Sequence, residues 1–106
     1  MSTPDRSSGR PAAASPQVRD QPSRTRFEAT LDGELVGFAE YRRSGSSVVF
    51  THTVVEPAWE GRGIGSALAR YGLDDARRRR LRVVPECPFI RSWIERHLSY
   101  ADLVSD

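Results

Sequence analysis

The chain has 106 residues, enough for one small domain with one hydrophobic core. Its 16 basic and 14 acidic residues give a net charge of +2, which does not by itself indicate a nucleic-acid or membrane partner. A single cysteine excludes an internal disulfide, and no apolar run reaches the roughly 20 residues of a membrane-spanning helix or forms a signal-peptide core. We therefore expect a cytoplasmic protein that does not enter a membrane.

The start of the chain differs from the rest in composition. Residues 1–23 are rich in proline, serine, alanine and arginine, with almost no apolar side chain that could join a core. We expect residues 1–23 to be a disordered tail and residues 24–106 to form the domain. An organelle transit peptide is the alternative for such a start, but Asp5 and Asp20 argue against it.

Three strands are predicted next. Apolar and polar residues alternate over residues 27–31, and Asp32-Gly33 offers the positive φ values of a tight hairpin. Residues 34–43 form the return strand, Ser44-Gly45-Ser46 supplies a second turn, and the β-branched run 48–55 is the third strand. The result is a three-stranded antiparallel meander.

The second half of the chain alternates helix and strand. Ile64, Leu68 and Tyr71 have helical spacing and predict a helix over about 63–79, although Gly72 costs about 1 kcal/mol relative to alanine. Residues 81–84 then form a short strand, parallel to the third because a crossover separates them. A second helix begins at Pro88. The order β-β-β-α-β-α predicts a mixed α/β fold, an antiparallel meander followed by α-β-α.

A glycine-rich loop joins the third strand to the first helix. Gly61, Gly63 and Gly65 let the backbone approach a ligand closely, and the helix N-terminus presents free N–H groups and a positive dipole end. Ser66 can add a hydroxyl donor, so the loop favours a phosphate group. The alternative is a plain glycine-rich turn.

Two other phosphate-binding motifs fit poorly. A Rossmann fingerprint follows the first strand of a long parallel sheet, whereas an antiparallel meander precedes this loop. A Walker A loop needs Gly-Lys-Ser/Thr, which the sequence lacks.

Four motifs in order resemble the GNAT superfamily of acyl-CoA-dependent N-acyltransferases, and more narrowly its compact single-domain GNAT-like subfamily. The segment 60–65 (EGRGIG) matches both glycine positions of the superfamily loop Arg/Gln-x-x-Gly-x-Gly/Ala. The other motifs are 50–53 (FTHT), 85–89 (PECPF) and Arg96-His97 followed by 100–103 (YADL). The resemblance covers about residues 27–104.

The resemblance implies an N-acetyltransferase that carries acetyl from acetyl-CoA to an amine. It implies that loop amides hold the pyrophosphate of coenzyme A, while backbone groups at the end of the third strand pair with its pantetheine arm. The residues expected to bind the donor are Val54, Val55, Glu60, Gly61, Arg62, Gly63, Ile64, Gly65 and Ser66. Two departures are Glu60, where most members carry Arg or Gln, and Leu98-Ser99, which replace a usual Pro-Glu.

Cys87 is the first candidate catalytic residue. It lies between Pro85 and Pro88 at the predicted start of the second helix, where the helix dipole stabilises a thiolate. The alternative is a buried small apolar side chain. The compact subfamily carries cysteine here, which implies either an acetyl-cysteine intermediate or a wall of the acyl pocket.

His52, on the third strand, is the second candidate, because an imidazole suits a base that deprotonates an acceptor ammonium. A structural hydrogen bond is its alternative. Trp93 stands where the compact subfamily tends to carry a tyrosine that protonates the leaving thiolate, so that acid is absent or moved. His97 is expected to be structural, and no pattern predicts a metal site.

The run Arg77–Arg80 with Arg82 admits several interpretations. A helix C-terminus favours cations, and aspartates four residues before two of these arginines favour a solvated helix end. Contacts with the 3′-phosphate of coenzyme A, or with nucleic acid, are alternatives. Two function classes besides acetyl transfer therefore stay open: a coenzyme A binding module without catalysis and a basic nucleic-acid-associated protein.

Overall fold

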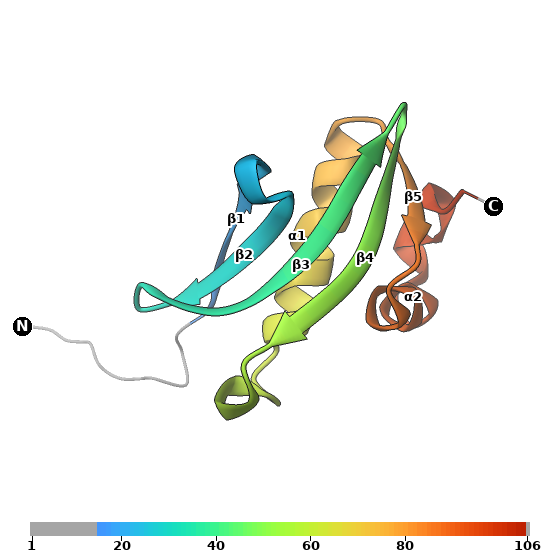
Figure 1. The fold of residues 1–106 in the computed structure, drawn as a ribbon. Helices are drawn as coiled ribbons and strands as arrows, with labels where there is room; N and C mark the ends of the chain where they lie inside the picture. The colour runs from blue at the N-terminus through green and yellow to red at the C-terminus, as the bar shows by residue number, and fades with distance from the viewer. Residues whose placement is uncertain (1–14, 106) are drawn as a thin grey trace, which may run out of the picture.

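A five-stranded sheet in the order β1-β2-β3-β4-β5 organises the computed structural model, which describes residues 15–105 (Figure 1). Helix α1 crosses one face of the sheet, and α2 lies beside α1 near the β5 edge. In chain order, with η for a 3₁₀ helix, the elements are β1 (Gln17–Gln21), η3 (Pro22–Arg24), β2 (Arg26–Leu31), β3 (Glu34–Ser44), β4 (Ser47–Val55), η4 (Pro57–Trp59), α1 (Ile64–Arg78), β5 (Arg82–Pro85), α2 (Pro88–Glu95) and η5 (Leu98–Leu103).

The predicted meander and crossover are confirmed. Strands β2, β3 and β4 pair antiparallel, and β5 pairs parallel with β4 after the α1 crossover. Asp32 and Gly33 have φ values of 50° and 82°, so both central residues of the first turn adopt the left-handed region that an Asp-Gly hairpin requires. The mixed α/β class therefore follows from local sequence patterns.

Strand β1 corrects the predicted start of ordered structure. Residues 17–21 pair antiparallel with β2 and residues 22–24 form a 3₁₀ turn, so the expectation of disorder is wrong for this part of the chain. The strand is held by its backbone ladder and by Asp20, which accepts a 2.6 Å hydrogen bond from the Tyr41 hydroxyl. An edge strand needs little apolar surface, which is why composition did not reveal it. The remainder of the expected tail, residues 1–14, lies outside the described residues.

Helix α1 continues through Gly72, where the sequence raised a question. Gly72 is buried, and a Cβ there would lie 2.9 Å from the ring of Phe50. Glycine is therefore the residue that lets the helix approach β4 closely, and this packing offsets its low helix propensity. Phe50 also lies near Phe27, which packs against Tyr41 and Tyr71, so an aromatic cluster fills the layer between helix and sheet.

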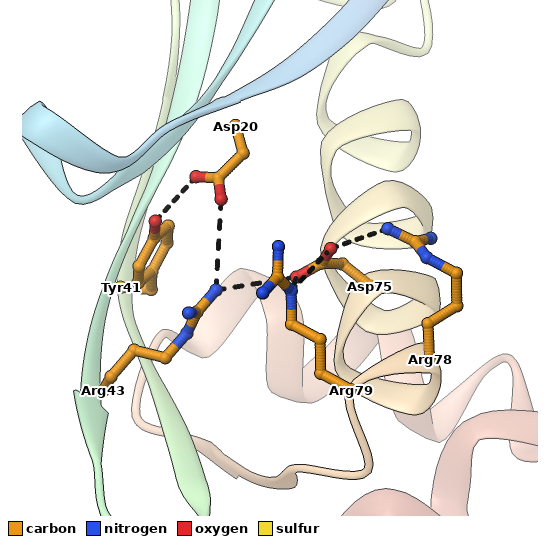
Figure 2. Close-up of polar contacts among 6 residues, drawn as sticks. All are labelled: Asp20, Tyr41, Arg43, Asp75, Arg78 and Arg79. Atoms are coloured by element: carbon orange, nitrogen blue, oxygen red, sulfur yellow. Dashed lines mark hydrogen bonds and ion pairs between the residues drawn. The ribbon is translucent and has the colours of Figure 1, made fainter.

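The C-terminal half of α1 is tied to the sheet by ion pairs around Asp75 (Figure 2). This carboxylate is almost fully buried and lies 2.7 Å from Arg78, 2.9 Å from Arg79 and 3.6 Å from Arg43 of β3. Arg43 also lies 4.0 Å from Asp20 of β1, so Figure 2 shows it between the two aspartates. The network therefore connects β1, β3 and α1.

Alkaline pH should weaken the β1–β3 contact. Burial and the hydrogen bond to Asp20 raise the pKa of Tyr41 to about 12. The unfolded chain releases this proton near pH 10, so the stabilisation is complete below about pH 10 and is lost as the pH rises toward about 12. We expect Tyr41→Phe to lose less unfolding free energy than the parent between about pH 9 and pH 11, measured by urea denaturation. Some loss remains in the variant, because burial also raises the pKa of Tyr100. Equal losses in the two proteins would contradict this assignment.

Candidate functional site

A cleft of about 380 Å³ opens where β4, the glycine loop and the start of α2 meet. Its lining residues are Thr53, Val55, Trp59, Glu60, Gly61, Gly63, Ile64, Gly65, Ser66 and Phe89. Most of the residues that the sequence assigned to donor binding therefore surround one cavity. In the ribbon, this region lies at the end of β4 opposite the β3–β4 turn (Figure 1).

One side of the cleft is an unpaired stretch of β4. Strand β5 pairs with β4 only as far as Phe50, whereas β4 continues to Val55. The last bond to β4 is the one from the Cys87 N–H to the Phe50 carbonyl at 2.8 Å, and the chain then leaves the sheet because α2 begins at Pro88. Within the described chain, the second half of β4 therefore has no neighbouring strand on its β5 side.

The register with β3 decides which backbone groups face this open edge. The Glu56 N–H bonds the Val36 carbonyl at 2.9 Å, and hydrogen-bonded pairs alternate along an antiparallel ladder. Val54 consequently directs its backbone groups toward β3, and Thr53 and Val55 direct theirs toward the cleft. Val54 also does not line the cavity. Of the two valines that the sequence assigned to donor binding, Val55 lies at the cleft and Val54 does not, while Thr53 lies there as well.

The three glycines of the loop have different physical roles. Gly61 and Gly63 have φ values of 82° and 81°, in the left-handed region that favours glycine. Gly65 instead allows close helix packing, because a Cβ there would lie 2.8 Å from Cζ of Phe89. The first α1 bond runs from the Ala67 N–H to the Gly63 carbonyl. The N–H groups of residues 64–66 therefore have no intrahelical acceptor and remain available to a ligand.

Ser66 is oriented by a tryptophan from α2. The indole N–H of Trp93 donates a 3.1 Å hydrogen bond to the Ser66 hydroxyl oxygen, so the hydroxyl hydrogen remains free to bond a group in the cleft. Trp93 is fully buried and stacks on His97, whose Nδ1 lies 2.7 Å from the Trp93 carbonyl oxygen. Trp93 and His97 thus support the cleft wall from behind, in agreement with the structural role expected for His97.

Three cleft residues were missed by the sequence reasoning: Thr53, Trp59 and Phe89. Trp59 belongs to η4 and carries the Arg62 guanidinium 5.1 Å above its ring, so Arg62 is held beside the loop by a cation–π contact. A tryptophan just before a glycine loop was the available sequence signal for Trp59. Phe89 had no such signal, because its close approach to Gly65 arises only in the folded chain.

Cys87 lies behind the cleft wall. It immediately precedes α2, as predicted, but its side chain is only 2 % exposed and it does not line the cavity. Its Sγ lies 3.4 Å from Oγ1 of Thr53, and Thr53 does line the cavity. The thiol is therefore separated from the cleft by the Thr53 side chain.

His52 lies on the other side of the sheet. Successive side chains of a strand alternate between faces, so His52 projects away from the face that carries Thr53. Its side chain is 55 % exposed, its Nε2 lies 3.0 Å from Oε1 of Glu40, and its ring contacts Phe38 edge to face. The two candidate catalytic residues, His52 and Cys87, are thus not brought together at one point.

The arginine run lies at the opposite end of α1 from the glycine loop. Of the predicted i,i+4 pairs, Asp75 with Arg79 is present, but Arg78 also binds Asp75, and Asp74 accepts a hydrogen bond from Tyr100. The suggested contact of these arginines with the 3′-phosphate of coenzyme A does not fit this position. Their ion pairs support the helix-end interpretation instead.

The residues with structural description form no group of three or more His, Cys, Asp or Glu side chains that could hold a metal ion. Over the same part of the chain, no helix is both long and apolar enough to cross a membrane.

Comparisons with known proteins agree with this geometry. Residues 26–103 match the model of the GCN5-related N-acetyl-transferase family. A GCN5-like protein from Staphylococcus aureus, solved by NMR, aligns with a TM-score of 0.66 at 21% identity, over 84% of this chain and 87% of that one. At that identity the likeness concerns the fold. No functionally curated protein matches the sequence significantly. Because the family match spans most of the chain, including the cleft, the protein belongs to the GCN5-related N-acetyltransferase family.

Proposed function

We propose that the protein transfers the acetyl group of acetyl-CoA to an amine. The observation that carries this proposal is the cleft, which combines the free N–H groups at the start of α1 with the unpaired edge of β4. The first of these suits a pyrophosphate, and the second suits the amide-containing pantetheine arm.

Each part of the donor has candidate partners in the cleft. The pyrophosphate accepts hydrogen bonds from the loop amides between Glu60 and Gly65, with the Ser66 hydroxyl and the Arg62 guanidinium nearby. Glu60 offers no attraction to phosphate through its side chain, so binding there rests on backbone groups. The pantetheine amides pair with the backbone of Thr53 and Val55. In this arrangement the thioester lies at the Thr53 side of the cleft, with Cys87 buried behind Thr53.

We place the acceptor amine on the opposite face of the sheet, where His52 is exposed beside Glu40. In this arrangement His52 accepts a proton from the incoming ammonium, directly or through water, and the free amine attacks the thioester carbonyl from the side away from the cleft. Cys87 lies on the other face, behind the cleft that would hold acetyl-CoA, and would act on the thioester from there. A nucleophilic role for Cys87 requires Thr53 to move aside, because Cys87 is buried behind it.

Release of free thiol from acetyl-CoA tests the proposal. Poly-L-lysine, spermidine and a peptide with a free N-terminus serve as amine probes. We expect amine-dependent thiol release and an acetylated amine by mass spectrometry. We also expect His52→Gln to slow the reaction about 10²-fold, which is typical for loss of a general base. An unchanged rate in His52→Gln would remove His52 from the mechanism.

The alternative, a coenzyme A binding module without catalysis, gives a different result in the same experiment. Acetyl-CoA would raise the melting temperature, since it binds the native state, yet no amine would release thiol.

A further inference from the structure

The chain lacks a tyrosine at the cleft that could protonate the departing thiolate of coenzyme A. The sequence contains three tyrosines, and all are described. Tyr41 and Tyr100 donate their hydroxyls to Asp20 and Asp74, and Tyr71 packs against Phe27. The three are also absent from the cleft lining. A proton donor, if the reaction uses one, must therefore be another group.

The Thr53 hydroxyl is placed to carry a proton into the cleft. Thr53 lines the cavity, and its hydroxyl oxygen lies 3.4 Å from the Cys87 sulfur. The Cys87 backbone is fixed by its N–H bond to Phe50, and its side chain makes no capping bond to α2. A hydroxyl can accept one hydrogen bond and donate another at the same time. Thr53 can therefore connect the buried Cys87 thiol to an atom of a molecule bound in the cleft that the thiol itself does not reach.

We propose that Cys87 and Thr53 together form the acid that protonates the leaving sulfur of coenzyme A. When the thioester C–S bond breaks, its electron pair goes to the coenzyme sulfur, which takes the hydroxyl proton of Thr53. Thr53 takes the thiol proton of Cys87 in the same step. Cys87 is left as a thiolate and regains a proton from solvent, into which the base releases the proton of the acceptor amine.

This inference rests on the proposed acetyl transfer and gives Cys87 a role that its burial permits. In the relay, Thr53 touches the reacting sulfur and Cys87 acts through Thr53. The buried thiol stays in place throughout, whereas an acetyl-cysteine intermediate requires the Cys87 sulfur to reach the thioester carbon.

The first arm of the test removes the Thr53 hydroxyl while keeping the shape of the side chain. With acetyl-CoA and the best amine probe, we expect Thr53→Val to lower kcat about 10²-fold and Thr53→Ser, which keeps a hydroxyl, to stay within about 3-fold of the parent. Thr51→Val is the matched control. Thr51 lies on the same strand but does not line the cleft, and its hydroxyl donates a hydrogen bond to the Glu40 carbonyl. Because the Thr51 hydroxyl does not face the donor, removing it should leave kcat unchanged. All variants should keep the melting-temperature shift with acetyl-CoA.

The second arm changes the leaving group. The thiolate released from 4-nitrothiophenyl acetate needs no proton, so with this donor Thr53→Val and Cys87→Ala should fall within about 3-fold of the parent. With acetyl-CoA, the double variant should be no slower than either single variant, because the two groups act as one unit. An equal defect with both donors would assign Thr53 to packing alone and overturn the relay.

Two further outcomes separate the relay from the proposed function. If acetyl accumulates on Cys87 when acetyl-CoA is added without an amine, Cys87 is a nucleophile and the relay is wrong while acetyl transfer stands. If the parent turns over and Thr53→Val matches it, the relay alone fails. A parent that binds acetyl-CoA but releases no thiol with any probe overturns the proposed function and the relay together.

Discussion

Acetyl-CoA is expected to raise the melting temperature of the parent but not that of Gly63→Gln. Gly63 precedes α1 with φ 81°, so a side chain strains the loop and moves the N–H groups that would bind the pyrophosphate. At an acetyl-CoA concentration 100 times the Kd, the unfolding free energy of the parent should rise by about 2.7 kcal/mol. For a domain of this size, this raises the melting temperature by many degrees. Differential scanning fluorimetry measures both proteins.

Gly45→Gln is the matched control for this substitution. Gly45 also has a positive φ, 58°, and no atom lies within 4 Å of a Cβ built there, as at Gly63. Both substitutions therefore carry a similar backbone cost of about 1 to 2 kcal/mol. Gly45 lies in the β3–β4 turn at the far end of β4, so this variant should keep the full ligand shift (Figure 1). A full shift in Gly63→Gln would show that the loop does not hold the donor.

The largest loss of stability is expected from Asp75→Ala. Asp75 is 3 % exposed, and its carboxylate contacts the guanidinium groups of Arg43 in β3, Arg78 at the end of α1 and Arg79 just after it (Figure 2). Its loss removes charge-assisted hydrogen bonds from Arg78 and Arg79, but the guanidinium groups left behind are 36 to 63 % exposed and stay hydrated, so we expect a cost of about 2 kcal/mol. Urea denaturation should show a lower midpoint with an unchanged slope.

Asp102→Ala tests whether burial is the reason. Asp102 makes a two-point contact with Arg77, but both side chains are largely exposed. Solvent screens such a pair, so we expect a much smaller change in the unfolding midpoint than in Asp75→Ala. If the two variants are equally destabilised, the buried network has no special role in tying α1 to the sheet.

The parts of the fold that follow from local patterns could be predicted from the sequence. The alternation over residues 27–31 and the Asp32-Gly33 turn reflect burial and backbone conformation within a few residues. Strand β1 could not be predicted in this way. Its pairing is a backbone interaction, and the contact of Asp20 with Tyr41 joins residues 21 positions apart.

The candidate site shows the same division. The glycine loop was located because positive φ values at Gly61 and Gly63 are a property of single residues. The choice between Val54 and Thr53 depends on the β3–β4 register, which contains an irregularity beside Tyr41 that no sequence pattern marks. The burial of Cys87 depends likewise on how α2 packs against β4.

An NMR titration of ¹⁵N-labelled protein with acetyl-CoA tests the central claim most directly, because it reports on each backbone amide. We predict shift changes concentrated in the loop from Glu60 to Ser66 and at Thr53 and Val55, where the free backbone groups line the cleft. The arginine-rich end of α1 should change little. Changes confined to that end, or no saturable change at the loop and the open edge of β4, would contradict the assignment of the cleft to the acyl donor.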